Sequence, residues 1–177
     1  MQTSARSYYS TAWGQGAVSV SEHGVNRVWL PGEADNAGAE QGESLLSKRA
    51  AQQLERYFQG ILQIFDLPVD LSCITPFRQR VLRETCRIPY GTVTTYGALA
   101  RAIGVSAAAR AVGGALAANP IPLIVPCHRV VAVSGDLTGF SAAGGLSMKK
   151  FLLSLEHVDM STIDRRQKVQ VMNNVFL

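Results

Sequence analysis

The sequence predicts a protein of two unlike parts, with strands and one helix before residue 75 and mostly helices after it. Two observations carry this prediction. Residues 16–31, "GAVSVSEHGVNRVWLP", have the pattern of two short strands around a turn at Glu22-His23-Gly24. The C-terminal part carries apolar stretches at helical spacing, separated by short turns with Gly or Pro. A chain of 177 residues suffices for one ordinary domain or two small ones that share an interface.

The first part continues with a loop and a helix. "GEADNAGAEQGES" is polar and glycine-rich and predicts the loop. From Ser44 onward apolar residues recur at helical spacing, and Gly60 can end the helix. The apolar positions are Leu46, Ala50, Leu54, Tyr57 and Phe58. The segment "DLPVDLSCI" is expected to connect this helix to the second part.

The second part opens with a clear helix start. Thr75 is a natural N-cap, and Pro76 suits the first helical position. Two short helices are predicted further on, one over about Thr95–Ile103 and one that begins after Ser106 as N-cap and runs to about Ala118. The linker "GVS" between them is short and contains Gly, which is typical of a helix-turn-helix.

The helix after Ser106 has one apolar face and one face that is almost without side chains. At 100° per residue, the apolar face holds Ala108, Val112, Ala115 and Leu116, and the opposite face holds Arg110, Gly113, Gly114 and Ala117. Each glycine inside a helix costs about 1 kcal/mol relative to alanine. The bare face can press its backbone against another surface while Arg110 projects, or it can pack on a neighbouring helix through its small residues.

The segment "VPCHRV", Val125–Val130, sets a thiol, an imidazole and a guanidinium side by side after the apolar run "PIPLIV". We expect "PCHRVV" to form a strand. Adjacent residues of a strand point to opposite sides, so contact between Cys127 and His128 needs a bridging water or a turn at Pro126–Cys127. Cys127 is either a small buried apolar residue, as most free cysteines are, or a reactive thiol, which requires a suitable environment.

A glycine-rich loop, "SGDLTGFSAAGG", leads from this segment into a helix over "LSMKKFLLSLEHV". The helix is expected to place Met148, Phe151, Leu152 and Leu155 on its apolar side. Glu156 borders that side, and a partly buried carboxylate needs a partner. The candidate partners are His128, Arg129 and a helix N-terminus.

The composition indicates a globular chain and argues against several classes of protein. Hydrophobic residues make up 47% of the chain and charged residues 17%, so a disordered chain is excluded. No stretch approaches the length of a membrane span, and "MQTSARSYYSTAWG" lacks the apolar segment of a secretory signal. The three cysteines favour free thiols in a reducing compartment, and neither their spacing nor the three histidines indicate a metal site.

The net charge of +4 is unevenly distributed. Residues 1–75 carry five basic and eight acidic side chains, whereas residues 76–177 carry twelve basic and five acidic ones. A basic C-terminal part beside an acidic N-terminal part indicates either a polyanionic partner or a basic surface that only meets solvent.

Five segments of the second part resemble one known family. They are "TPFRQRVL", "IPYGTVTTYGALA", "AARAVGGALAANPIPLIVPCHRVV", "GDLTGF" and "KKFLLSLE", and they are similar to the methylated-DNA–protein-cysteine methyltransferases, or 6-O-alkylguanine-DNA alkyltransferases. The resemblance is dense over residues 75–157 and looser upstream. It implies an α/β N-terminal domain of ribonuclease-H-like type over residues 1–74. It also implies a mainly α, winged-helix-like C-terminal domain with a helix-turn-helix over residues 75–158, which binds DNA and accepts the alkyl group, followed by a tail over residues 159–177.

The resemblance implies direct reversal of DNA damage. The family moves a methyl or other alkyl group from the 6-oxygen of guanine in double-stranded DNA irreversibly to its own cysteine, after the nucleotide has been flipped out of the duplex. Each molecule reacts once, with no cofactor and no metal. We therefore expect a monomer that binds the minor groove of DNA, makes no membrane contact, and works in the cytoplasm, or in the nucleus of a eukaryote.

The resemblance also assigns roles to the residues of the reacting group. Cys127 resembles the alkyl acceptor, and His128 and Glu156 resemble the base that the family links to the thiol through a water. Tyr96 matches the tyrosine that aids rotation of the nucleotide and donates a proton to the base. Arg129 is interpreted as a structural residue paired with a carboxylate.

Contacts with the substrate are implied in the same way. Arg110 resembles the finger that fills the space of the flipped nucleotide, and small residues beside it permit close approach to the minor groove. The implied DNA-binding residues are Thr95, Tyr96, Ala109, Arg110, Gly113 and Gly114. The implied alkylguanine pocket includes Asn119, Pro122, Val130 and Ser141. Phe140 departs from the family, in which tyrosine is common at this position.

Two other functions compete with alkyl transfer. A lesion-recognising relative would flip the base without accepting the alkyl group, but such relatives lack the cysteine, whereas Cys127, His128 and Glu156 occur together here. A Cys–His hydrolase would turn over repeatedly, and it does not require Arg110 on a bare helix face.

Overall fold

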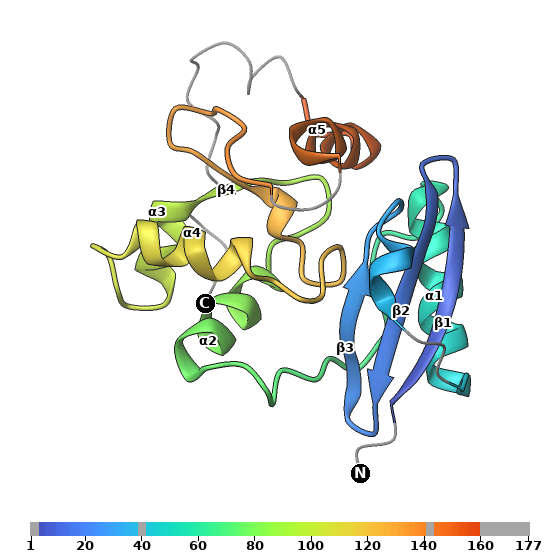
Figure 1. Cartoon of the computed structure of the whole chain (residues 1–177). Coiled ribbons are helices and arrows are strands. Elements are labelled where there is room, and N and C mark those ends of the chain that lie inside the picture. The colour runs from blue at the N-terminus through green and yellow to red at the C-terminus, as the bar shows by residue number, and fades with distance from the viewer. Residues whose placement is uncertain (1–3, 39–41, 141–143, 160–177) are drawn as a thin grey trace. The chain divides into compact units, whose positions relative to one another are not determined.

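The computed structural model of the chain describes residues 4–38, 42–140 and 144–159 (Figure 1). The chain divides into two compact units, Met1–Ile74 with Pro120–Ile124, and Thr75–Asn119 with Val125–Leu177. Ser141 and all but the first residue of the expected tail lie outside the described residues. Within the described part of the chain, no helix is both long and apolar enough to span a membrane.

The first unit is a three-stranded antiparallel sheet with one helix. β1 (Ala5–Thr11), β2 (Gly14–Ser21) and β3 (Gly24–Trp29) lie in the order β1-β2-β3, and the 3-10 turn η1 (Ala34–Ala37) follows. The predicted hairpin is confirmed as β2 and β3, whose register runs from Ala17 opposite Trp29 to Ser21 opposite Gly24. β1 is the strand that the sequence pattern does not reveal.

β1 escapes prediction because its buried side is partly polar. Arg6 and Ser7 are both buried, so the strand shows no simple alternation of apolar and polar residues. The Arg6 guanidinium lies over the Trp29 ring, 4.9 Å from its centroid. Ser7 Oγ lies 2.9 Å from Ser47 Oγ on the neighbouring helix. These polar groups are tolerated in the core because they have partners there.

The helix of this unit, α1 (Leu45–Phe58), begins and ends where the sequence predicts. Ser44 Oγ accepts a hydrogen bond from Ser47 N–H at 3.1 Å, and Ser47 Oγ accepts one from Ser44 N–H at 2.9 Å. This reciprocal pair is a capping box. Gly60 takes the left-handed conformation, with φ at 72°, just after the helix. The fully buried core residues of α1 are Ala50, Leu54 and Tyr57.

The second unit is mostly helical. Its elements are α2 (Pro76–Thr85), β4 (Thr94–Thr95), α3 (Tyr96–Ala102), α4 (Ala109–Ala117), the 3-10 turn η2 (Cys127–Arg129), β5 (Val130–Val131) and α5 (Gly145–Leu155). β4 and β5 pair in parallel, with Thr94 opposite Val130 and Thr95 opposite Val131. This pairing brings the start of α3 beside the strand that follows η2.

The turn between α3 and α4 is longer than predicted. α4 begins at Ala109 with Ala108 as its N-cap, so the expectation that Ser106 caps this helix is wrong. The Ala108 N–H donates to the Val105 carbonyl at 2.8 Å and closes a turn before the helix begins. The apolar face is confirmed in its buried members Val112, Ala115 and Leu116.

Two arginines of α2 hold the C-terminal ends of α3 and α4. Arg80 donates to the carbonyl of Ile103, and Arg78 donates to the carbonyl of Ala118. Ile103 and Ala118 are the C-caps of α3 and α4. Carbonyls at a helix C-terminus lack intrahelical donors and favour a nearby cation. α2 therefore fixes both helix ends within this unit.

Two details around the cysteine segment and α5 differ from expectation. Cys127–Arg129 is a turn and not a strand, because Cys127 N–H donates to the Val125 carbonyl at 2.8 Å and Arg129 N–H donates to the Pro126 carbonyl at 3.0 Å. α5 is rotated relative to the predicted face. It buries Met148, Lys149, Leu152 and Leu153, whereas Phe151 and Leu155 are half-buried.

Candidate active site

Cys127 is half-buried within an otherwise buried segment. Between Ile121 and Val131, a stretch described throughout, Cys127 is the one residue that is not buried. The turn η2 removes the alternation of a strand, so the side chains of Cys127 and His128 need not point to opposite sides. The residues on both sides of Cys127 stay in the core.

His128 is fully buried and is oriented by Glu156. The imidazole Nε2 lies 2.9 Å from Glu156 Oε1. An ionised carboxylate only accepts hydrogen bonds, so Nε2 carries the proton of the neutral ring, and Nδ1 carries the lone pair that can take up a proton. Burial lowers the pKa of His128, while the hydrogen bond and the charge of Glu156 act in the opposite direction. The resting imidazole is therefore neutral at pH 7.

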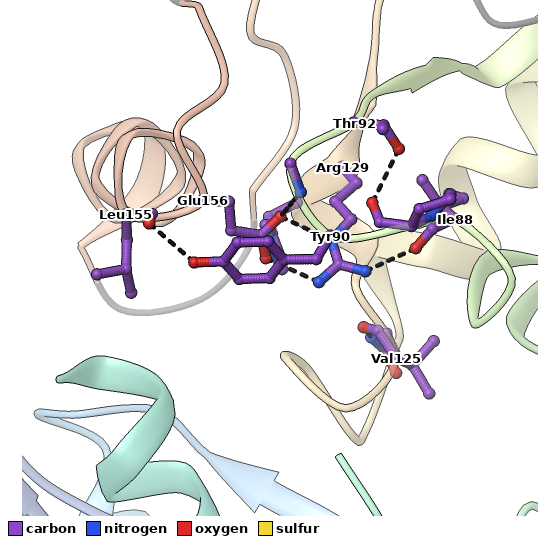
Figure 2. Close-up of polar contacts among 11 residues, drawn as sticks. Ile88, Tyr90, Thr92, Val125, Arg129, Leu155 and Glu156 are labelled. Atoms are coloured by element: carbon purple, nitrogen blue, oxygen red, sulfur yellow. Dashed lines mark hydrogen bonds and ion pairs between the residues drawn. The ribbon is translucent and has the colours of Figure 1, made fainter. Parts of the chain in front are cut away.

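Arg129, which follows His128 in the chain, binds the same carboxylate of Glu156 (Figure 2). Its Nε donates to Glu156 Oε2 and its Nη2 to Glu156 Oε1, both at 2.8 Å, and its Nη1 donates to the Ile88 carbonyl at 2.6 Å. Gly91 N–H adds a hydrogen bond to Oε2 at 3.2 Å. The expectation that Glu156 needs a buried partner is confirmed, and the two candidate side chains both bind it.

The electrostatics of Glu156 follow from these partners. Burial by itself would raise the pKa of the carboxyl, but the hydrogen bonds and charges of His128 and Arg129 lower it to about 2. The carboxylate is ionised at every physiological pH. Tyr90 closes the site on one side, since its hydroxyl donates to the Leu155 carbonyl at 2.9 Å and its ring lies 5.8 Å from the Arg129 guanidinium carbon (Figure 2).

The thiol of Cys127 is neutral in this structure at pH 7. Burial raises its pKa, and a hydrogen bond from Asn119 and the charge of Lys149 act in the opposite direction. Asn119 stands two residues after α4, and its Nδ2 also donates to the Val125 carbonyl at 2.9 Å. A neutral thiol is a poor nucleophile, so the site has to remove the proton when the reaction begins.

Tyr96, the first residue of α3, lies close to the cysteine segment through the β4–β5 pairing. Its hydroxyl donates to the Thr138 carbonyl at 3.2 Å. Burial raises the pKa of Tyr96, and the nearby Cys127 thiolate would raise it further. The phenol therefore keeps its proton at pH 7 and can act as a donor.

Lys149 is a residue of the site that sequence reasoning missed. Its side chain is fully buried, and its Nζ donates to the Val130 carbonyl at 2.7 Å and to the Thr138 carbonyl at 3.0 Å. Burial lowers its pKa to about 8. The available signal was its spacing from Leu152 and Leu153, three and four residues on, which puts Lys149 on the apolar side of α5.

The residues assigned to DNA contact lie in different surroundings. Arg110 and Gly114 are exposed on α4, and Ala109 and Gly113 are half-buried. Thr95 is buried and uses its hydroxyl to accept the N–H of Ala98 at 3.1 Å, as the N-cap of α3. Pro122 is buried in the segment that belongs to the first unit. Ser141 lies outside the described residues.

The arrangement combines a nucleophile, a base and a proton donor. Cys127 supplies sulfur, His128 can accept a proton, Glu156 with Arg129 fixes the tautomer of the imidazole, and Tyr96 carries a phenolic proton. No group of three or more His, Cys, Asp or Glu side chains is placed to hold a metal ion within the described ranges. The chemistry that these side chains support is nucleophilic attack by sulfur on an electrophilic carbon.

Comparisons of the sequence point to one family. The profile described as "6-O-methylguanine DNA methyltransferase, DNA binding domain" matches residues 76–158. A methylated-DNA–protein-cysteine methyltransferase of Mycobacterium bovis is 50% identical over 107 residues, which cover 60% of this chain and 63% of that protein. The match thus spans less than two thirds of that relative. The constitutive methylated-DNA–protein-cysteine methyltransferase of Bacillus subtilis is 36% identical over 160 residues, or 85% of this chain and 96% of that protein.

Comparisons of the fold agree with those of the sequence. An O6-methylguanine methyltransferase of Mycobacterium tuberculosis superposes with a TM-score of 0.73 at 36% identity, covering 86% of this chain and 92% of that one. OGT of the same organism, solved in complex with DNA, superposes with a TM-score of 0.76 at 35% identity, covering 90% of this chain and 99% of that one.

Proposed function

Since the chain belongs to the methylated-DNA–protein-cysteine methyltransferase family, we propose that it repairs DNA by moving an alkyl group from the 6-oxygen of guanine to Cys127. The observation that carries this proposal is a half-buried thiol followed directly by an imidazole that is fully buried against a carboxylate, with 2.9 Å between Nε2 and Oε1. In such an arrangement the imidazole supplies the base for the proton of the thiol.

The reaction begins with deprotonation of the thiol. His128 takes the proton of Cys127 at Nδ1 through a water, and Glu156 stabilises the imidazolium that forms, as the acid does in other triads of this kind. Glu156 can do this without becoming protonated, because the pKa of its carboxyl is held at about 2 by its hydrogen bonds. The thiolate is then the nucleophile.

The transfer step moves one carbon from oxygen to sulfur. A bond forms between Cys127 Sγ and the alkyl carbon while the bond from that carbon to guanine O6 breaks, and the bonding pair stays on the oxygen. Guanine takes up one proton from the Tyr96 hydroxyl. The proton that His128 took from the thiol then returns Tyr96 to its neutral form through solvent, so in sum one proton leaves the thiol and one reaches the base. The product thioether is not reversed by water, and each chain reacts once.

The substrate has to reach the thiol, and α4 carries the residues for this step. A base inside a duplex must be extruded, which costs a few kcal/mol. Arg110 fills the space of the flipped nucleotide, and Ala109, Gly113 and Gly114 let the helix enter the minor groove, where long side chains would obstruct it. Exposure of Arg110 and Gly114 supports this role. The protein acts on double-stranded DNA as a monomer.

The pocket for the base lies around the cysteine segment in this proposal. A carbonyl oxygen has two lone pairs, and Lys149 Nζ uses one of those of Val130. The other lone pair accepts a hydrogen bond from the guanine amino group. Asn119 links α4 to the segment through Val125. The resemblance alone assigns Pro122 and Ser141 to this pocket and Thr95 to DNA contact.

We also infer the finer classes of the two units. The first is of ribonuclease-H-like type, which the antiparallel β1-β2-β3 sheet with α1 supports. The second is winged-helix-like, with α3 and α4 as its helix-turn-helix. The support is the turn between Ala102 and Ala109, in which Gly104 is left-handed, with φ at 75°, and Val105 N–H donates back to the Ala100 carbonyl at 2.9 Å.

A stoichiometry experiment tests the function. The protein is incubated with excess duplex DNA that carries a labelled methyl group on guanine O6, and label per chain is counted. One equivalent that does not increase with time, and that is absent from Cys127→Ser, supports alkyl transfer. Binding of the duplex without label on the protein would identify a lesion-binding protein, and continuing release of label would identify a hydrolase.

A further inference from the structure

The exposed arginines of the second unit differ in what their guanidinium groups bind. In the part of this unit that the structure describes, they are Arg80, Arg83, Arg87, Arg101 and Arg110. The first three are held by protein groups, namely the Ile103 carbonyl, the Gln79 side chain at 3.4 Å and the Glu84 carboxylate at 3.2 Å. Arg101 and Arg110 form no hydrogen bond or ion pair with a described residue. These two side chains are therefore available to an anion outside the protein.

Arg101 does not serve the end of its own helix. It lies in the last turn of α3, where a cation can bind the C-terminal carbonyls. Its guanidinium lies one turn earlier, since a Cβ on Gly97 would be 3.8 Å from Arg101 Nη1. The carbonyl of Ile103, the C-cap of α3, is bound by Arg80 instead. The Arg101 side chain thus runs back along α3 toward its first turn, as side chains of a helix slant.

This orientation brings the Arg101 guanidinium close to the residues proposed to meet DNA. Gly97 follows Tyr96 in the chain, and a Cβ on Gly113 of α4 would lie 3.8 Å from two carbons of the Tyr96 ring. α3 and α4 pack against each other within the second unit (Figure 1). Arg110 lies one turn before Gly113 on the same side of α4. The two available guanidinium groups therefore lie near one contact, that of Tyr96 with Gly113, one on each helix.

We propose that Arg101 binds a backbone phosphate of the DNA next to the flipped nucleotide, and that it anchors α3 on the duplex while Arg110 enters the base stack. The proposal rests on the proposed function for the identity of the polyanion. A guanidinium matches a phosphate in charge and in the geometry of its donors. Since a phosphate carries no sequence information, the contact should be made on any duplex, with or without an alkylated base.

The test is the salt dependence of binding to a short duplex without a lesion, on which no transfer can occur. Each phosphate that a cation neutralises releases counterions, so the logarithm of affinity falls with the logarithm of salt concentration by about 0.9 per contact. Arg101→Gln should reduce the magnitude of this slope by about 0.9 and weaken binding about tenfold at 0.1 M salt. The difference from the unaltered protein should narrow as the salt concentration rises.

Matched variants separate a phosphate contact from a general loss of charge. Arg101→Lys retains the charge and should keep a slope close to that of the unaltered protein. Arg83→Gln removes an exposed arginine of α2 that already contacts Gln79, and should leave the slope unchanged. All variants are checked by thermal unfolding and titrated with two duplexes of unrelated sequence, on which Arg101→Gln should lose affinity equally.

Three results would overturn the proposal. They are an unchanged slope in folded Arg101→Gln, an equal reduction in Arg83→Gln or in Arg101→Lys, and a loss of affinity confined to one of the two duplex sequences.

Failure of this proposal can be told from failure of the function proposed above. If the unaltered protein takes no label from methylated duplex while Arg101→Gln reduces the slope as expected, alkyl repair is wrong and the phosphate contact stands. If label is transferred and the slope does not change, the repair function stands and the role of Arg101 is wrong.

Discussion

Arg129 donates to both carboxylate oxygens of Glu156 at 2.8 Å, from the position next to the histidine that Glu156 orients. His128 and Arg129 therefore meet the same carboxylate although they are neighbours in the chain, which the turn η2 makes possible. The bidentate contact neutralises Glu156 and fixes its plane. The imidazole is then held in one tautomer by a group that does not itself titrate near neutral pH.

Replacing Glu156 with Gln should lower the free energy of unfolding by about 3–5 kcal/mol, because the change leaves the buried Arg129 guanidinium without its counter-charge. Urea unfolding at neutral pH measures this. The double variant Arg129→Met/Glu156→Gln removes both charges and should recover much of the loss. Arg87→Met is the matched control, since Arg87 pairs with Glu84 at 3.2 Å but its side chain is 64% exposed.

The free energy of unfolding of Arg87→Met should fall only slightly, because exposed ion pairs contribute little to stability. Equal losses in Arg87→Met and Glu156→Gln would contradict the importance of burial for the Arg129–Glu156 pair. Strict additivity in the double variant would show that the two side chains are not coupled.

The protein should lose stability as the pH falls below neutral. Burial lowers the pKa of His128 from 6.5, and the hydrogen bonds and charges of His128 and Arg129 lower that of Glu156 from 4.5 to about 2 against the effect of burial. The unfolded chain therefore binds protons that the folded protein does not, so this stability is present above the ordinary pKa values and is lost as the pH falls toward the folded ones.

The contribution of Glu156 is on the order of 3 kcal/mol and should disappear between about pH 4.5 and about pH 2. Urea unfolding at a series of pH values measures it. Glu156→Gln lacks the titrating group and should show a flatter profile over this range. A flat profile in the unaltered protein would be the contrary result.

Much of the fold follows from local signals in the sequence. Ser44 and Gly60 delimit α1, and the Val-rich runs around Glu22-His23-Gly24 form the hairpin. β1 gives no such signal, because Arg6 and Ser7 are buried through partners that are distant in sequence. The predicted start of α4 is wrong for a different reason. A turn closed by the hydrogen bond from Ala108 N–H to the Val105 carbonyl precedes the helix, so Ser106 does not cap it.

The candidate site likewise has one residue whose contacts the sequence predicts and one whose contacts it does not. The prediction that Glu156 has buried polar partners rests on its place beside the apolar face of a helix and on the cost of burying an unpaired carboxylate, and the structure confirms it. Lys149 could not be found by composition, since lysine is rarely buried without a partner. The spacing of Lys149 from Leu152 and Leu153 indicates that it is buried, but its partners are the carbonyls of Val130 and Thr138, which any residue could supply, so the sequence does not identify them.

Arg110→Ala should slow alkyl transfer from duplex DNA on the order of 100-fold, because the finger offsets part of the few kcal/mol that extrusion of a base costs. Transfer from the free alkylated base, which needs no extrusion, should change little. Single-turnover rates on both substrates measure the split. Arg83→Ala, which removes an exposed arginine of α2, is the control for loss of charge. Equal slowing on both substrates would contradict the finger role.

Substitutions of Gly114 test whether the bare face of α4 approaches DNA closely or packs within the protein. A Cβ at Gly114 would meet no heavy atom within 4 Å outside the helix backbone. Gly114→Ala should therefore raise stability by about 0.5–1 kcal/mol, since glycine is costly inside a helix. Gly114→Leu should stay folded but weaken binding to duplex by about tenfold, or about 1.4 kcal/mol.

Ser154→Leu adds the same side chain at an exposed position of α5 and should leave DNA binding unchanged. Thermal unfolding and a duplex binding titration are measured on all three variants. Unchanged binding in Gly114→Leu would show that the bare face of α4 does not approach DNA closely.

The most direct measurement is the site of the methyl group after reaction. The protein is mixed with excess duplex that contains O6-methylguanine, digested, and mapped by mass spectrometry, while the guanine in the DNA is quantified. We predict one methyl group per chain, on Cys127 and not on the exposed Cys73 or Cys86, with one guanine restored for each modified chain. Restored guanine without a modified Cys127, or a methyl group on another cysteine, would contradict transfer to Cys127.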